Sequence, residues 1–142
     1  MTKPVPVQNF RLDQTGLARL FGELEARIMD VMWDLGEGTI QDVCDHLGAC
    51  NYLTVTTVMN RLVYKKALRR RRVAKAYFYA PIQAREEFLR AISQQVVRSL
   101  VHDFGKLAIA QFASVLDELP AEELAELEQV VRQARQKAEQ KR

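Results

Sequence analysis

Hydrophobic residues in the first third of the chain recur at intervals of three and four, the spacing of one face of an α-helix. The first stripe begins at Leu20 and stops before Gly36 and Gly38, which predicts a helix over residues 20–35. Thr39 then stands where an N-cap hydroxyl is expected, with Asp42 three residues on. A shorter helix over 40–47 should follow, and its inner face holds Ile40, Val43, Cys44 and Leu47.

A third helix is expected with Thr54 as its cap, because Val55, Val58, Met59 and Leu62 again share one face. The period then changes to two over residues 68–73 and 76–80, which predicts two short strands joined by a turn near Ala74 and Lys75. Three helices closed by a β-hairpin form a winged helix-turn-helix. Residues 20–82 are therefore predicted to be one mostly α-helical domain with a small β-hairpin wing.

Residues 83–142 are predicted to be helical, with three apolar stripes and Pro120 at the start of the last helix. So much apolar surface beside a small winged domain favours a C-terminal helical dimerisation domain. The alternative is that these helices fold back on their own winged domain. The residues expected in the dimer interface are Leu89, Ile92, Val96, Leu100, Phe104, Ala108, Phe112, Val115, Leu124, Leu127 and Val131.

Charge is distributed unevenly along the chain. From His46 to Arg85 there are nine Lys or Arg and no Asp or Glu, and eight of the nine lie between Arg61 and Lys75. Residues 1–82 carry 12 basic against 8 acidic side chains, whereas residues 83–142 carry 9 against 10. A basic, acid-free stretch within a winged helix-turn-helix indicates that the partner is double-stranded DNA.

The outward face of the third helix offers hydroxyl, amide and guanidinium groups, which bond base edges and phosphates. Sequence reading is expected from Thr56, Thr57 and Asn60, with Arg61 beside them, and phosphate contact from the basic residues that follow. An alternative for the four consecutive arginines is a solvated strand edge kept soluble by charge. The expected DNA-binding residues are Thr54, Thr56, Thr57, Asn60, Arg61, Tyr64, Lys65, Lys66, Arg69, Arg70, Arg71, Arg72 and Lys75.

Three segments, in matching order and spacing, resemble the BlaI/MecI/CopY penicillinase-repressor family. Residues 20–33 resemble the opening helix of that family, residues 54–66 its recognition helix, and residues 75–81 the second strand of its wing. The similarity spans about residues 20–119. The resemblance implies a homodimeric transcriptional repressor that binds an operator with dyad symmetry and is connected with antibiotic resistance.

The resemblance also implies a release mechanism, in which a membrane sensor of β-lactams triggers proteolysis at an Asn-Phe bond in the dimerisation helices. The matching bond here is Asp103-Phe104, so the asparagine is replaced. Lys66 is a second departure, since relatives have a glycine there that ends the recognition helix; this helix is expected to run further or end less sharply. The paired C-terminal cysteines of the copper-responsive branch are absent, so copper sensing by that route is not expected.

Two other functions remain open from the sequence. Cys44, His46 and Cys50 suggest a metal- or redox-responsive regulator, although their spacing is not a standard zinc pattern and Cys44 lies on an apolar stripe. A winged helix used only for protein interaction is the other, since fold alone does not fix function. No catalytic constellation or cofactor motif is visible, so neither an enzyme nor a cofactor is expected.

Residues 1–19 contain two prolines and no periodicity, which predicts a flexible N-terminal arm. The chain has no leader and no apolar run long enough for a membrane span, and its two cysteines fit a reducing interior in which thiols stay free. The protein is therefore expected to be cytoplasmic. Trp33 and Tyr52 are expected to be core and turn residues.

Overall fold

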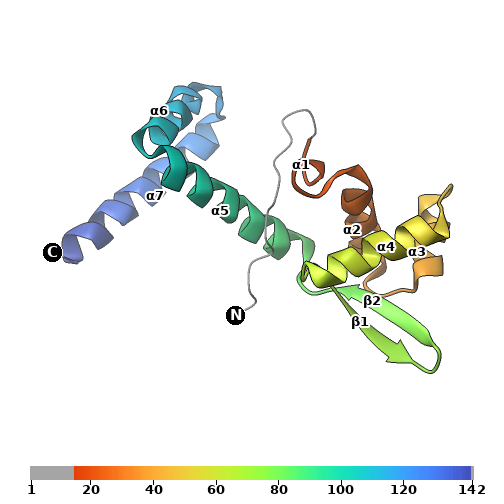
Figure 1. Cartoon of the computed structure of the whole chain (residues 1–142). Helices are drawn as coiled ribbons and strands as arrows, with labels where there is room; N and C mark the ends of the chain where they lie inside the picture. Colours follow the sequence, from red (N-terminus) through yellow and green to blue (C-terminus); the bar gives the residue numbers. More distant parts are fainter. Residues whose placement is uncertain (1–14, 142) are drawn as a thin grey trace. The chain divides into compact units, whose positions relative to one another are not determined.

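The computed structural model describes residues 15–141, which form two compact units that meet between Val97 and Arg98. The first unit contains α1 (Ala18–Phe21), α2 (Glu23–Leu35), α3 (Ile40–Leu47), α4 (Tyr52–Tyr64), β1 (Leu68–Val73), β2 (Ala76–Pro81) and the first turns of α5 (Arg85–Phe104) (Figure 1). The second contains the end of α5, α6 (Lys106–Ser114), the 3₁₀ turn η1 (Leu116–Glu118) and α7 (Ala121–Gln140).

The first predicted helix is split in two. Gly22 adopts φ 84°, a backbone region that favours glycine, and separates α1 from α2. At the other end of α2 the backbone N–H of Gly36 donates to the carbonyl of Met32, so the predicted stop is confirmed. Since α1 begins at Ala18, the expected arm over residues 1–19 overlaps a helix; residues 1–14 lie outside the described residues.

Side-chain caps fix the starts of α3 and α4. The predicted cap of α3 is confirmed: the N–H of Asp42 donates to Thr39 Oγ1 at 3.1 Å, and the N–H of Thr39 donates to Asp42 Oδ2 at 2.9 Å. The predicted cap of α4 is wrong. Asn51 caps this helix instead, because its extended backbone lets Oδ1 accept the N–H of Thr54 at 3.2 Å, and α4 therefore begins at Tyr52.

Cys44 and Cys50 form a disulfide across the turn between α3 and α4, and their Cα atoms lie 5.7 Å apart. The expectation of free thiols, which rested on the cellular compartment alone, is therefore wrong for this structure. The physical reason is local: Gly48 adopts φ 83° after α3 and turns the chain back, so that Cys50 comes within disulfide distance of the helix.

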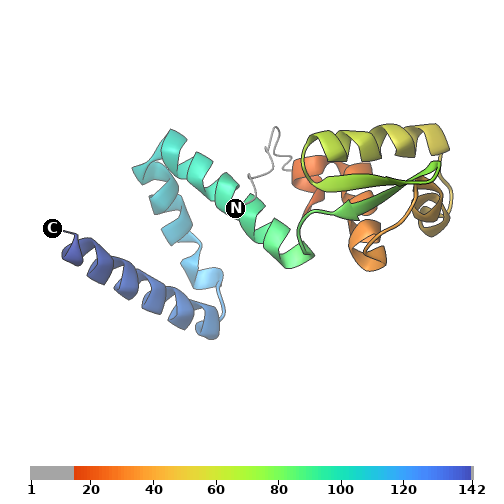
Figure 2. The same cartoon turned by 90° about the horizontal axis from the view of Figure 1, so that it is seen from below.

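The two strands form an antiparallel hairpin in which Leu68 pairs with Pro81 and Val73 pairs with Ala76, so the predicted turn at residues 74–75 is confirmed. The loop between α2 and α3 extends this sheet. Gly38 and Tyr79 exchange two backbone hydrogen bonds, of 3.0 and 2.8 Å. The hairpin lies beside α4 (Figure 2), which makes the first unit a winged helix-turn-helix, as predicted.

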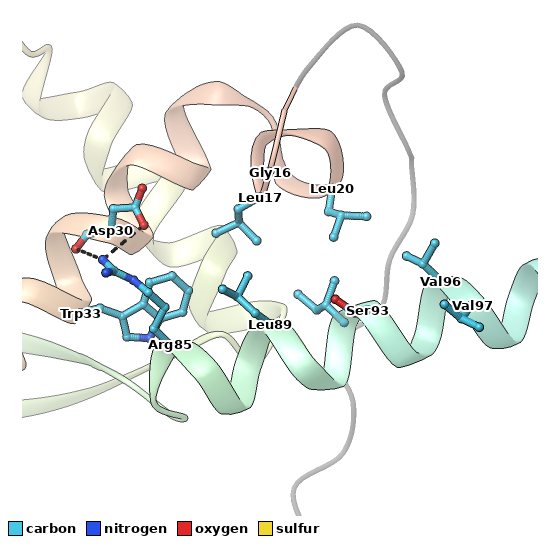
Figure 3. Close-up of a pocket in the computed structure, with 11 residues that line it drawn as sticks. Gly16, Leu17, Leu20, Asp30, Trp33, Arg85, Leu89, Ser93, Val96 and Val97 are labelled. Carbon is cyan, nitrogen blue, oxygen red and sulfur yellow. Dashed lines mark hydrogen bonds and ion pairs between the residues drawn. The ribbon is translucent and has the colours of Figure 1, made fainter. Parts of the chain in front are cut away.

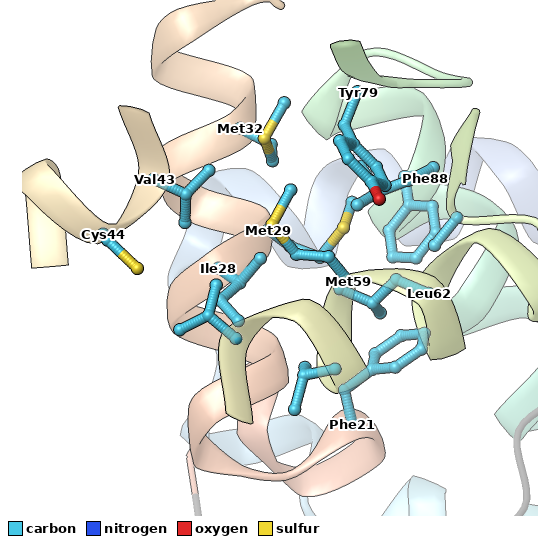
Figure 4. Packing of buried hydrophobic residues seen from close by; sticks show 14 of the residues in the cluster. Phe21, Ile28, Met29, Met32, Val43, Cys44, Met59, Leu62, Tyr79 and Phe88 are labelled. Atoms are coloured by element: carbon cyan, nitrogen blue, oxygen red, sulfur yellow. The ribbon is translucent and has the colours of Figure 1, made fainter. Parts of the chain in front are cut away.

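One hydrophobic core joins all elements of the first unit (Figure 4). The first turns of α5 belong to it, because Phe88 and Ile92 are almost fully buried. The ring of Phe88 lies 5.6 Å from that of Phe21 and 5.3 Å from that of Trp33, measured between centroids. This part of α5, which the sequence pattern placed in the dimerisation tail, thus packs on the winged domain, as in the alternative arrangement.

The second unit has no core of its own among residues 98–141, since none of these side chains is buried. The middle one of the three predicted apolar stripes, from Phe104 to Leu119, is divided between three elements: Phe104 ends α5, α6 stops at Ser114, and the chain continues as η1. Five large apolar side chains are more than half exposed: Phe104 at 58%, Leu107 at 67%, Ile109 at 59%, Phe112 at 55% and Val130 at 59%. This unit thus leaves a large apolar surface open to solvent.

Candidate nucleic-acid interface

The outward face of α4 is the candidate reading surface, because the second helix of a DNA-binding helix-turn-helix enters the major groove with its N-terminal residues against the bases. Here that end presents Tyr52 and Leu53, which are 50% and 76% exposed. The sequence predicted Tyr52 to be a turn residue and did not include Leu53 among the residues that contact DNA. Neither residue type is characteristic of DNA contact. Both lie in the first turn of α4, because the cap is Asn51 and not Thr54 as the sequence pattern predicted.

The predicted threonines lie on this face with their hydroxyl protons already used. Thr56 Oγ1 donates to the carbonyl of Tyr52 at 2.8 Å, and Thr57 Oγ1 donates to that of Leu53 at 3.0 Å. Each hydroxyl oxygen keeps its capacity to accept. Thr57 is exposed and Thr56 half-buried, so Thr57 is the better placed of the two to accept a hydrogen bond from a base amino group.

Asn60 connects α4 to the wing. Its Oδ1 accepts a hydrogen bond of 2.9 Å from Arg70 Nη1 and another of 3.0 Å from the buried hydroxyl of Tyr79. A bidentate contact with adenine needs Oδ1 as acceptor and Nδ2 as donor. Because Oδ1 has both its acceptor positions occupied, Asn60 keeps only its Nδ2 donors for DNA.

Arg61 and Lys65, both expected to contact DNA, share a carboxylate from α2. Lys65 Nζ lies 3.1 Å from Glu25 Oε2, and Arg61 Nη1 lies 3.3 Å from Glu25 Oε1. Glu25 is the buried charged residue of the described core, and Lys65, only 17% of whose side chain is exposed, also lies over the ring of Phe21. Lys65 is therefore a structural cation, while Arg61 keeps 53% of its side chain exposed.

The four arginines of β1 do not form one surface, because successive side chains of a strand point to opposite faces. Arg70 and Arg72 share the face of Asn60 and lie over the ring of Tyr77, at 4.8 and 5.8 Å from its centroid. Arg69 and Arg71 occupy the other face. The predicted continuous run of phosphate contacts is thus divided between two sides of the wing.

Arg71 is engaged by an acid from the loop before α3. Its Nε lies 3.1 Å from Glu37 Oε2, and a second hydrogen bond joins its Nη2 to Oε1. The hydrogen bonds from Arg71 hold the pKa of the Glu37 carboxyl below its usual value, and the same pairing raises the pKa of Arg71. This pair fixes the wing to the body of the domain.

Lys66 and Lys75 stand exposed at the two ends of the hairpin region. Lys66 has φ 67°, the left-handed conformation usually given to glycine, and α4 ends at Tyr64 just before it. The expectation that the helix runs further or ends less sharply is therefore wrong: lysine adopts the conformation of the glycine it replaces. Tyr64, the last predicted DNA contact on α4, is 86% exposed.

The residues predicted for dimerisation fall in both units. Leu89, Ile92 and Val96 belong to the first, where Ile92 is buried at 2% and so is occupied by the core of its own chain. The others lie in the second unit, where they are exposed or half-buried. The Asp103–Phe104 bond lies in the last turn of α5, and both side chains are exposed.

A cavity of about 550 Å³ opens in the first unit between the start of α1, α2 and α5 (Figure 3). Leu17 and Leu20 face Leu89 across it, and an ion pair between Arg85 and Asp30, with Nη2 and Oδ1 3.4 Å apart, closes one end. The lining comes from α1 and the two residues before it, from α2 and from α5, and it includes no residue of the wing.

No group of three or more His, Cys, Asp or Glu side chains within residues 15–141 is arranged to hold a metal ion. Cys44 and Cys50 are bonded to each other, and His46 is exposed with Nδ1 2.9 Å from the carbonyl oxygen of Asp42. In the same part of the chain no helix is both long and apolar enough to cross a membrane.

Comparison with known proteins gives one family and two close sequence relatives. The family model described as penicillinase repressor matches residues 21–133. The transcriptional regulator BlaI of Mycobacterium tuberculosis, from strains CDC 1551 / Oshkosh and ATCC 25618 / H37Rv, is 36% identical over 80 residues, a match that covers 54% of this chain and 57% of each relative. The chain thus spans a little over half the length of these curated relatives.

Among solved structures, the chain is similar to a MarR/EmrR family transcriptional regulator from Acinetobacter sp. ADP1. The TM-score is 0.40 at 19% identity, with 87% of this chain and 82% of that chain covered. The two chains share only a loose arrangement of elements at this score, so the winged-helix assignment rests on the helices and hairpin described above.

Proposed function

Because this chain belongs to the penicillinase repressor family, we propose that it is a cytoplasmic transcriptional repressor that binds double-stranded operator DNA through α4 and the wing. The observation that carries the proposal is the surface of these two elements. Over residues 46–85 they present neutral and basic side chains and no carboxylate of their own, on a helix whose exposed end is the one that reads bases in this fold.

The side chains divide the work between sequence and phosphate. Tyr52, Leu53 and Thr57 occupy the exposed part of α4 that would lie against base edges, with an aromatic ring, an apolar side chain and a hydroxyl acceptor. Of the eight basic residues between Arg61 and Lys75, Glu25 holds two and Glu37 holds one. The five left for phosphate are Lys66, Arg69, Arg70, Arg72 and Lys75.

The first test is selection of bound sequences from a random DNA pool near physiological salt, followed by titration of the selected site. Thr57→Ala should weaken binding to the selected site more than to random DNA, whereas Arg72→Ala should weaken both about equally. Arg90→Ala removes an exposed arginine of α5 and serves as the matched control. Equal losses for Thr57→Ala and Arg72→Ala on both DNAs would refute this division.

Salt dependence tests the count of phosphate contacts. Five contacts per chain predict a slope of log K against log salt of about −4.5, whereas all eight basic residues would give about −7. Absence of any DNA binding at low salt would instead favour a winged helix that serves protein interaction, the second function that the fold allows.

The proposal includes a homodimer held by the second unit. Its support is the apolar surface that residues 98–141 leave exposed, which a second copy would cover. A dimer would place two α4 helices against half-sites about 34 to 36 Å apart, or a multiple of that spacing, on an operator with dyad symmetry. A single chain would bind one half-site and lose most of the affinity.

Phe112→Glu should convert the dimer to monomers, because it places a charge on the exposed apolar face of α6. Gln129→Glu adds the same charge at an exposed polar position of α7 and should leave the dimer intact. Sedimentation velocity measures both. A truncation test must cut after Val97 and not after Pro81, since removal of Phe88 and Ile92 would open the core.

Release of the operator is proposed to follow proteolysis in the second unit, by a membrane sensor system or another protease. The Asp103–Phe104 bond is the candidate, because it lies in the last turn of α5 beside Gly105, where the helix ends and little structure must unwind. Chains recovered from cells in which the target operon is expressed should then include fragments that end at Asp103. Recovery of intact chains alone from such cells would refute proteolytic release.

A further inference from the structure

The disulfide lies within the turn of the helix-turn-helix itself. Cys44 belongs to α3 and is 5% exposed, whereas Cys50 is exposed and immediately precedes Asn51, the cap of α4. These are the two cysteines of the chain. The bond therefore joins the supporting helix to the residue just before the cap of the helix that would read DNA.

Besides the disulfide, hydrogen bonds hold the two ends of this turn. The N–H of Gly48 donates to the carbonyl of Cys44 at 3.2 Å, and Asn51 Oδ1 accepts the N–H of Thr54. Both lie at helix ends, and the disulfide is the covalent link between them. Without it, residues 48–51 would gain conformational freedom next to Tyr52 and Leu53, the exposed start of α4.

We infer that Cys44 and Cys50 form a reversible dithiol–disulfide site that sets the operator affinity of the recognition helix, an inference that rests on the proposed DNA-binding function. The disulfide holds the start of α4 in one arrangement, so the oxidised chain loses less conformational freedom on binding a specific site. The oxidised form should bind the selected operator about three- to tenfold more tightly than the dithiol form. Binding to random DNA should not change, because the basic residues of the wing lie outside the turn.

The positions of the two sulfurs suit such chemistry. The exposed Cys50 thiolate would attack a hydroperoxide, ROOH, taking one oxygen to give a sulfenic acid and releasing ROH. The thiol of Cys44 then displaces water from that sulfenic acid and the S–S bond forms, so the pair loses two electrons and two protons in total. A dithiol reverses the change by thiol–disulfide exchange, becoming a disulfide itself while both cysteines return to thiols.

The test uses the full chain, prepared with dithiothreitol or with hydrogen peroxide that is then removed. Thiol alkylation and intact mass give the redox state, operator and random-DNA titrations give the affinities, and amide hydrogen exchange reports on residues 48–55. Cys50→Ser, at an exposed position, and Cys44→Ala, at the buried one, should each bind like the dithiol form whatever the treatment.

Three differences between the oxidised and the dithiol form would support the inference. The oxidised form should be lighter by two hydrogens, exchange amide hydrogens in the turn more slowly, and bind the operator more tightly with no change on random DNA. Two freely alkylated thiols after peroxide, or a disulfide between two chains, would overturn it. If the disulfide forms but the oxidised and dithiol forms bind the operator with affinities equal within twofold, the claim that the disulfide sets operator affinity is overturned. If neither form binds DNA, the proposed function fails, and the exchange and alkylation data still decide whether the redox site exists.

Discussion

Replacing Glu25 with Gln is expected to destabilise the winged-helix unit, because the substitution removes the carboxylate that pairs with Lys65 and Arg61 at the edge of the core. Glu25 is 6% exposed and accepts hydrogen bonds from Lys65 Nζ at 3.1 and 3.4 Å and from Arg61 Nη1 at 3.3 Å. Loss of one partner from a fully buried ion pair costs about 3 to 5 kcal/mol.

The cost here should be smaller, since Arg61 is half exposed and can turn to water. Lys65 has no such freedom with 17% of its side chain exposed. We therefore expect a loss of about 2 to 3 kcal/mol in the free energy of unfolding, below the range for a fully buried pair. Urea denaturation followed by Trp33 fluorescence measures it, at one fixed protein concentration because assembly would shift the midpoint.

Glu23→Gln is the matched control, since Glu23 is exposed on the same helix and should change stability by about 0.5 kcal/mol or less. Adding Lys65→Met to Glu25→Gln should restore much of the stability, because it removes the unpaired ammonium. A loss below about 1 kcal/mol for Glu25→Gln alone, or no recovery in the double variant, would refute the argument. The same substitution frees positive charge beside α4, so affinity for random DNA should hold or rise while stability falls.

Three further changes test other contacts. Lys66→Gly should raise the free energy of unfolding by about 0.5 to 1 kcal/mol by relieving the left-handed backbone, and a loss of stability would contradict the φ of 67°. Thr39→Ala should cost about 1 kcal/mol at neutral pH by removing the cap of α3. The backbone hydrogen bond from Thr39 lowers the pKa of Asp42. The stability that this carboxylate contributes is therefore complete above the ordinary aspartate pKa, about 3.9, and is lost as the pH falls through the lowered pKa. Measuring the free energy of unfolding of the original protein and of Thr39→Ala across acidic pH checks the sign. Asn60→Ala should cost about 1 to 3 kcal/mol, because the buried hydroxyl of Tyr79 loses its acceptor, and Tyr79→Phe in the same background should recover part of that loss.

Much of the winged helix could be predicted because its signals are local. The caps and stops at Thr39, Gly36 and Gly48 are set by residues within one turn of each helix end, and the alternation over residues 68–80 fixes the register of the hairpin. The inner faces of α2 to α4 followed from the helical period alone. Lys66 shows the limit of such local rules: the missing glycine suggested a change in backbone, and the chain kept the backbone with a different residue.

The role of the first turns of α5 could not be read from the sequence. Phe88 and Ile92 continue the same apolar period as residues further along the helix, and periodicity says which face is apolar without saying what covers that face. The structure shows that Phe21 and Trp33 cover it at this end. A boundary drawn at the end of the hairpin therefore fell inside a packed core.

The site shows the same limit more sharply, because its charges are paired across long stretches of chain. Glu25 meets Lys65 forty residues away, and Glu37 meets Arg71 thirty-four residues away. In the sequence these acids lie outside the acid-free stretch and seem unrelated to it. Folding brings them against it, where they hold Lys65 in place and tie the wing to the domain. Part of the positive charge that the sequence assigns to DNA therefore positions the helix and the wing. Removal of these acids should lower stability while affinity for DNA holds or rises.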